Sequence, residues 1–149
     1  MRTAASSRSS ATLPSVIYDS GAEGMALGTV AFGMDSFKVL LVDSSYTPDK
    51  VAHTRRSDIT GEVTGTGYTA GGAAVTIVID ATAADVTGIE LGGANWPLST
   101  ISAAGAIYYD SRGAAEDDDL VCYVDFGGTV TSLAGMFALQ QSVIQLHNP

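Results

Sequence analysis

The chain has 149 residues, about the length of one domain and enough to bury a hydrophobic core. Hydrophobic residues make up 46% of it and charged residues only 15%, so much of the surface must consist of Gly, Ala, Ser and Thr. The net charge of −9 repels phosphate backbones, and no basic run with interleaved aromatics offsets it, so nucleic-acid binding is not expected.

Residues 1–15, MRTAASSRSSATLPS, carry Arg2 and Arg8, no acid and little that could enter a core. This composition is typical of an extended N-terminal arm. We expect the arm to order on a neighbouring subunit, where the two arginines meet acidic groups and strand addition occurs if an edge is available. The alternative is an arm folded back on its own acidic body. Residues 16–149 are expected to form a single domain.

That domain reads as short runs of β-branched and aromatic residues separated by Gly, Asp, Ser and Pro. The pattern predicts a mostly β, single-domain antiparallel β-sandwich of jelly-roll-like type. A helix is conceivable over 19–27, but the glycines there argue against a stable one. The expected strands are 16–19, 27–32, 37–42, 60–66, 73–80, 86–91, 99–109, 119–126 and 135–146.

Several apolar residues are predicted to fill the core. Residues 37–42 have the composition of a strand covered on both faces, and Ile79 is expected to share one face with its neighbours at 75 and 77. Cys122, the single cysteine, is expected to be a buried hydrophobe, and Trp96 a core or core-edge residue. The core list is Val39, Leu41, Val75, Ile77, Ile107, Val121, Tyr123 and Val124.

Residues 43–58 form the longest expected loop, and loops of this length are usually functional or ordered by a partner. We therefore take four of its residues as candidate partner contacts, in addition to Arg2 and Arg8 in the arm. These four are Tyr46, Pro48, Arg55 and Arg56.

No catalytic, cofactor or metal site is predicted. The glycine-rich segment 65–71 resembles a phosphate-binding fingerprint, but a strand rather than a helix is expected to follow it, which favours a strand-to-strand connection. The acids at 116–119 lack the spacing of a calcium loop and are interpreted as a solvated loop, although cation binding there stays open. His53 and His147 lack zinc-ligand spacing and are expected to be partly exposed. No small-molecule substrate is implied.

Four segments in order resemble a family of small virion structural proteins of tailed bacteriophages. They are FKVLLVDSSYTP (37–48), EVTGTGYTAGG (62–72), STISAAGAIYYD (99–110) and YVDFGG (123–128). The resemblance spans roughly residues 16–140, and it implies a non-enzymatic subunit associated with the phage head as a decoration or cement protein. Its implied partners are the major capsid protein and copies of itself, with a trimer favoured. The basic arm and the ending QLHNP depart from the family pattern.

Three functions remain distinct at this point. The first is a capsid decoration or cement protein on the capsid exterior, made in the host bacterial cytoplasm because no leader-like or membrane-spanning apolar run is seen. The second is a tail, neck or fibre-base component of the virion. The third is a host-directed binding module, which would need a deep pocket with converging polar groups.

Overall fold

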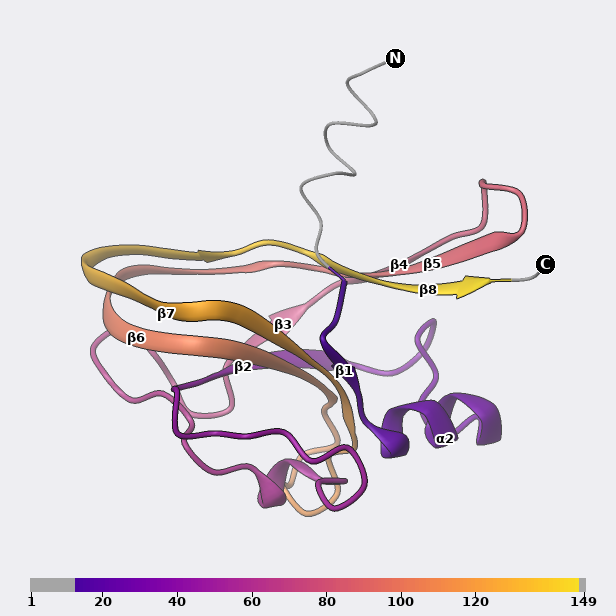
Figure 1. Cartoon of the computed structure of the whole chain (residues 1–149), viewed down its shortest axis with the longest axis horizontal. Coiled ribbons are helices and arrows are strands. Elements are labelled where there is room, and N and C mark those ends of the chain that lie inside the picture. The colour runs from indigo at the N-terminus through magenta and orange to yellow at the C-terminus, as the bar shows by residue number, and fades with distance from the viewer. Residues whose placement is uncertain (1–12, 148–149) are drawn as a thin grey trace.

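The computed structural model describes residues 13–147 (Figure 1) and has the expected fold class, a mostly β chain with two antiparallel sheets. The larger sheet has the order β1-β7-β6-β2-β3, and the smaller has the order β4-β5-β8. The strands are β1 (Val16–Ile17), β2 (Phe37–Val42), β3 (Ala73–Val75), β4 (Ile77–Asp80), β5 (Val86–Leu91), β6 (Ala94–Asp110), β7 (Leu120–Leu139) and β8 (Ser142–His147). One α-helix, α2 (Asp19–Leu27), and one 3-10 turn, η1 (Arg56–Asp58), complete the described elements.

A single long ribbon contributes strands to both sheets. Strands β6 and β7 pair outward from the loop at 111–119 until Ala94 faces Leu139, and three residues further along each strand Leu91 faces Ser142. The β5–β8 ladder therefore continues the β6–β7 ladder without a slip in register. Figure 1 shows this ribbon folding back on itself at the end far from α2, so that β5 and β8 lie over β6 and β7. One folded ribbon thus builds much of both layers.

The fold-back, here called the ribbon bend (residues 96–101 and 132–137), is marked by irregular backbone on both strands. Leu98 and Ala134 have positive φ angles of 52° and 47°. The register shifts twice, between Trp96 and Ser99 and between Ser99 and Ile101. Such bulges increase local twist and bend a ladder. They therefore give a physical reason for the ribbon to turn here.

The larger sheet is buried on both faces. One face packs against the smaller sheet. On the larger sheet, Trp96 of β6 and Phe137 of β7 are paired across the ladder and lie edge to face, with 6.1 Å between their ring centroids. The other face carries a second cluster that includes Tyr18 and Tyr46, whose hydroxyls are 2.7 Å apart. The Tyr46 hydroxyl is also 2.8 Å from Nδ1 of His53. The long loop is thus tied to its own sheet by a chain of hydrogen bonds.

Most of the core prediction is confirmed. All six of the listed residues in β2, β6 and β7 are buried, and Val75 and Ile77 are partly buried against the core. The exception in this region is Ile79, which is 53% exposed. The expected strand 73–80 breaks at Thr76, and its two halves enter different sheets, so the shared face did not form.

Four further element predictions are wrong. The expected strand 135–146 is interrupted at residues 140–141, between the end of β7 and the start of β8. Residues 19–27 form a helix, and residues 27–32 form no strand but the end of that helix and the turns after it. Residues 60–66 are not a strand either, because only Glu62 and Thr66 form isolated bridges, to Val42 and Thr100. The helix succeeds because a Cβ on Gly21 would lie 2.7 Å from the carbonyl oxygen of Val121, so glycine there permits close packing on β7.

Candidate partner-binding surface

Charged residues are absent from the outer half of the ribbon. Residues 91–109 and 126–147 contain no Asp, Glu, Lys or Arg. This part comprises most of β6, most of β7 and all of β8, and it includes the ribbon bend. The opposite part of the molecule, which we call the loop end (residues 49–58 and 110–119), holds eleven of the chain's charged residues. The two ends therefore differ sharply in the cost of covering them with another protein.

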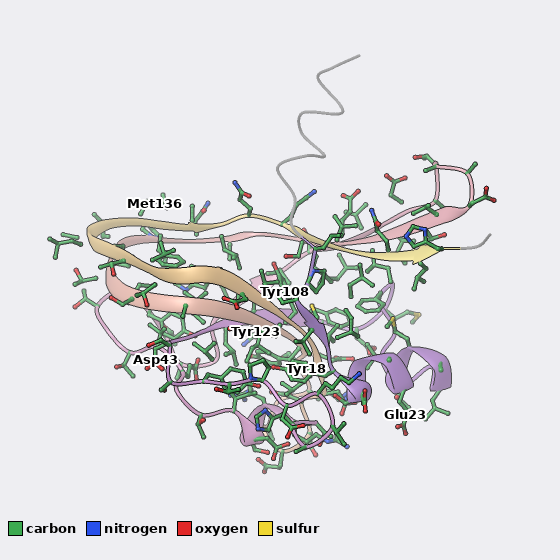
Figure 2. The ribbon with its side chains drawn as sticks, in the orientation of Figure 1. Tyr18, Glu23, Asp43, Tyr108, Tyr123 and Met136 are labelled. Carbon is green, nitrogen blue, oxygen red and sulfur yellow. The ribbon has the colours of Figure 1, made fainter. Side chains whose placement is uncertain are left out.

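Three large apolar side chains point to solvent at the ribbon bend. Leu98 is 77% exposed, Leu133 is 82% exposed and Met136 is 60% exposed. Leu98 precedes Ser99, which faces Gly135 across the ladder, so Leu98 and Met136 are close on the two strands. Figure 2 shows Met136 at the far end of the ribbon from Glu23. These three residues, the bend patch, form an apolar surface of the kind that marks protein contacts.

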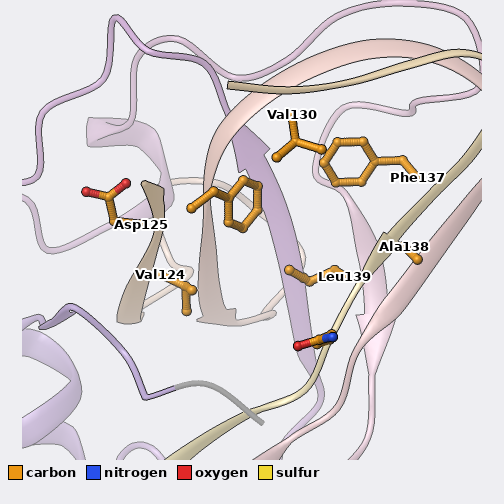
Figure 3. Close-up of a pocket in the computed structure, with 8 residues that line it drawn as sticks. Val124, Asp125, Val130, Phe137, Ala138 and Leu139 are labelled. Atoms are coloured by element: carbon orange, nitrogen blue, oxygen red, sulfur yellow. The ribbon is translucent and has the colours of Figure 1, made fainter. Parts of the chain in front are cut away.

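An apolar groove lies beside the bend patch, at the edge of β7 (Figure 3). Its volume is about 260 Å³, and Asp125 and Gln140 are its polar lining residues. In Figure 3 Val130 lies next to Phe137, and the Asp125 carboxylate points away from them. The apolar lining of this edge groove consists of Val124, Phe126, Val130, Phe137, Ala138 and Leu139.

The loop end is joined by ion pairs within the chain. Arg56 Nε is 2.7 Å from Asp118 Oδ2, and Arg55 Nη1 is 2.7 Å from Asp119 Oδ1. Arg112 pairs with Asp119 at 2.5 Å and with Asp110 at 2.9 Å. Asp118 is only 1% exposed, so the interpretation of 116–119 as a solvated loop is wrong for its second half. No spacing signal in the sequence indicates the pairs of Arg55 and Arg56, because each arginine lies more than 60 positions from its acid.

Asp110 is a buried carboxyl with a second acid beside it. Burial, followed by a hydrogen bond with Asp35, raises the pKa of Asp110 to about 7, while Arg112 opposes the rise. The same hydrogen bond is the main cause that lowers the pKa of Asp35. The two carboxyls therefore share a proton across a wide range of pH. Asp110 is only 1% exposed, so it is closed to solvent and its bond with Asp35 joins two loops.

The candidate contact residues of the long loop lie in different surroundings. Tyr46 is 5% exposed and packs in its own core, whereas Pro48 is partly exposed. Arg56 lies over the ring of Tyr109 as well as against its acid. Arg55 is the most open of the four and lines a polar hollow of about 430 Å³. The two arm candidates, Arg2 and Arg8, lie outside the described residues.

The segments weighed as catalytic or cofactor sites have structural roles. The glycine-rich segment leads into β3, as predicted, with Gly67 and Gly72 at positive φ angles of 83° and 80°. A Cβ on Gly72 would lie 1.8 Å from the carbonyl oxygen of Val39, so only glycine fits beside β2. Cys122 is buried as predicted, and burial raises the pKa of its thiol. His147 is exposed.

Within residues 13–147, no cluster of three or more His, Cys, Asp or Glu side chains is placed to hold a metal ion. The same residues contain no helix with the length and apolar character needed to cross a membrane. Comparison with known proteins found no matching family model, no matching curated protein and no matching solved structure.

Sequence reasoning missed the bend patch and the edge groove. The available signal was the absence of charge over two long stretches of strand, 91–109 and 126–147. An isolated exposed apolar residue means little, but a charge-free ribbon end with three of them is a coherent surface.

Proposed function

We propose that this chain is a structural subunit of a bacteriophage virion. Within the virion we propose the role of a decoration or cement protein that bridges major capsid protein subunits on the capsid exterior. The single observation that carries an assembly role is the charge-free ribbon end with its exposed bend patch. Covering this end with another protein removes apolar surface from water and strips no charge of its hydration. The head location rests on the sequence resemblance.

In this proposal the bend patch is the surface that meets the capsid, and the acidic loop end faces away. Cement proteins act mechanically, so modest contacts are enough when several subunits attach at once. The apolar lining of the edge groove favours a polypeptide partner and gives no support to a host-directed module that needs converging polar groups.

The test replaces exposed apolar residues by lysine at the two ends of the molecule. Leu133→Lys with Met136→Lys should leave the melting temperature nearly unchanged, because both side chains are exposed, and should reduce incorporation into particles at least tenfold. The matched control is Leu27→Lys with Val51→Lys, two exposed apolar residues away from the bend. Incorporation is measured on purified particles by gel densitometry.

Equal incorporation of both double variants would contradict the role of the bend patch. A cryo-EM reconstruction of the same particles tests the location separately. Copies around the local three-fold axes would support a cement protein, whereas a single ring at one vertex would contradict it and indicate a neck or tail component.

A further inference from the structure

Strand β4 forms an open edge of the smaller sheet. The strand order is β4-β5-β8, and within residues 13–147 β4 pairs with β5 alone. The pairs between the two strands are consecutive, and no residue from 77 to 80 has a positive φ angle. Ile77, Val78 and Ile79 are β-branched, and the last two are 52% and 53% exposed. A regular apolar edge of this kind can accept another strand, which completes its backbone hydrogen bonds.

A hollow beside this edge provides room for the side chains of an added strand. Its volume is about 370 Å³, and it is lined by residues of β3, the start of β4 and the segment 32–37. The apolar lining includes Phe32, Phe37, Val75 and Ile77. Because successive side chains of a strand point to opposite faces, alternate side chains of an added strand would lie on the side of Ile77, toward the hollow. The others would cover Val78 on the outer face.

Acidic residues lie at both ends of β4. Asp35 lines the same hollow as Ile77, and its side chain is 30% exposed. At the other end Asp80 is the last residue of the strand, and Asp85 lies in the exposed turn that leads to β5. The chain has no lysine or arginine from residue 57 to residue 111, so the β4–β5 hairpin itself carries no basic residue. The hairpin therefore attracts a basic segment.

The N-terminal segment 1–12 matches this edge in length and charge. Arg2 and Arg8 carry its only charged side chains, and the five residues between them are Thr, Ala and Ser. Extended, residues 3–7 span about 17 Å, and the four residues of β4 span about 13 Å. The segment contains no proline, so residues 3–7 can all donate to a ladder. Laid along β4, they bring the two arginines to the acids at its two ends, where charge-assisted hydrogen bonds form.

The sheet order favours a segment that comes from a second copy. β1 and β3 are the two edges of the larger sheet, and β4 follows β3 directly along the chain. The N-terminal segment leads into the β1 edge, where the Ser15 amide donates to the Tyr123 carbonyl oxygen at 2.8 Å. The residues next to the segment and the edge that accepts it therefore lie at opposite sides of one copy. Head-to-tail contacts between copies suit this arrangement, and a rotation that closes them forms a ring.

We propose that residues 3–7 of one copy add as a strand to the outer edge of β4 in a second copy, with Arg2 and Arg8 at the acids on either end. This goes beyond the proposed function, because it states how copies join each other and not what they attach to. Figure 1 shows the tip of the β4–β5 hairpin at the end of the molecule opposite the ribbon bend. The edge and the bend patch share no residue.

The test forms disulfides between full-length chains that each carry one added cysteine. The acceptor carries Val78→Cys, and four donors carry Ala4→Cys, Ala5→Cys, Ser6→Cys or Ser7→Cys. After mixing and mild oxidation, the best donor should give at least fivefold more covalent heterodimer with Val78→Cys than with Val51→Cys, an exposed valine of the long loop. Native Cys122 contributes little background because it is buried, and burial raises the pKa of its thiol.

A paired strand also predicts an alternating yield. Donors at positions 4 and 6 should differ from donors at 5 and 7 by at least threefold, because their side chains lie on opposite faces of the strand. The acceptor Ile79→Cys should reverse this preference, since Ile79 lies on the other face of β4, and it replaces Val78→Cys if that variant fails to fold. Equal yields from all four donors, or yields no higher than with Val51→Cys, would overturn the proposal.

Charge variants of the best donor test the role of the arginines. Arg2→Glu with Arg8→Glu should lower the heterodimer yield at least fivefold, whereas Arg2→Lys with Arg8→Lys should keep at least half of it. An unchanged yield with the two glutamates would overturn the assignment of the arginines to the acids at the ends of β4.

The chain that carries both Ser6→Cys and Val78→Cys distinguishes exchange from self-docking. Exchange predicts covalent oligomers, whereas a disulfide confined to single chains at every protein concentration would overturn the proposal. These measurements need no particles and alter no residue of the bend patch, and the lysine test of the bend patch leaves residues 1–12 and β4 unchanged. The two proposals therefore fail independently.

Discussion

The two ends of this sandwich are held together by different chemistry. At the loop end, loops from distant parts of the sequence are joined by arginine–carboxylate pairs centred on Arg112. At the ribbon bend, the strands are joined by neutral contacts, including a buried bond of 2.7 Å between the hydroxyls of Ser99 and Ser132. At the charged end Arg55, Arg56 and Arg112 are paired with acids of the same chain, whereas the neutral end exposes apolar side chains. Because these arginines already have partners within the chain, the neutral end is the surface better suited to assembly.

Removing Arg112 should have the largest effect on stability. Arg112→Ala leaves the buried Asp110 and Asp119 without this cation and also releases the Thr29 carbonyl, so the free energy of unfolding should fall by about 3 kcal/mol. Urea unfolding at pH 7 measures the change. The control is Arg55→Ala, which removes one more exposed ion pair and should cost less than about 1 kcal/mol. Equal losses would mean that the network is not centred on Arg112.

The neutral end should respond to loss of its buried hydroxyl pair. Ser132→Ala removes the bond to Ser99 and leaves the Ile101 amide without its side-chain acceptor, so we expect a loss of about 1–2 kcal/mol in urea unfolding. Ser102→Ala is the matched control, because its 2.9 Å bond to Thr131 lies on the exposed face of the same ladder. The control should lose only a few tenths of a kcal/mol. If Ser102→Ala lowered the free energy of unfolding more than Ser132→Ala does, the buried hydroxyl pair would not be the contact that stabilises the ribbon bend.

The shared proton at the loop end predicts a pH dependence. The folded chain raises the pKa of Asp110 to about 7 and keeps its proton up to that pH, whereas an unfolded aspartate has its ordinary pKa of 3.8. Folding therefore takes up a proton between these values, and the free energy of unfolding should fall as pH rises from about 4 to 7. Asp35, whose pKa is lowered, has the opposite effect on the free energy of unfolding, and this effect falls below about pH 4.

Asp110→Asn should remove that decline. Relative to wild type, the variant should gain stability as pH rises from 4.5 to 8, by about 1.4 kcal/mol for each unit by which the fold raises the pKa of Asp110, as measured by urea unfolding at each pH. Glu116→Gln, an exposed acid of the same loop, serves as the control for a general charge effect. Parallel pH profiles for wild type and Asp110→Asn would assign the decline to other groups.

The smallest effect is expected from relieving backbone strain in the bend. Ala134 adopts a φ of 47°, which is unfavourable for a residue with a Cβ. Ala134→Gly should raise the free energy of unfolding by about 0.5 kcal/mol, because relief of strain slightly exceeds the entropy that glycine loses on folding. Ala138→Gly, in the same strand with no positive φ, should instead destabilise the chain. Thermal melts of both variants provide the measurement.

The sequence predicted strands well where an apolar run lies in a continuous ladder. It predicted elements less well where close packing against the rest of the chain determines the secondary structure. β2 and β5 were predicted at their exact bounds because their runs end at turn residues. Helix α2 was doubted because of its glycines, yet a Cβ on Gly24 would lie 2.4 Å from Val30 Cγ2, so glycine is required there by contact and not by flexibility. Propensity alone carries no information about such close approaches.

The candidate surface was harder to predict for a related reason. The arginines of 43–58 looked available to a partner, but their acids are more than 60 positions away in the sequence and become neighbours only in the fold. Conversely, Leu133 and Met136 lie in an alternating strand pattern and resemble core residues until the bend exposes them. Charge-free segments were visible in the sequence, and their meaning depended on knowing that they form one end of a ribbon.

The continuous ladder from the 111–119 loop to β8 also has a consequence for how the chain folds. Pairing that starts at Tyr109 and Leu120 closes only a short loop. Each further pair, up to Val86 with His147, then has a small additional entropic cost of loop closure, because the preceding pair already holds the two strands together. Zipping in this order reaches distant contacts without a separate long-range search. The ladder shifts register between Ala103 and Gly105, where β7 carries extra residues that include Gly127 at a φ of 78°. Zipping should pause at that point, so substitutions beyond it should change the unfolding rate more than the folding rate.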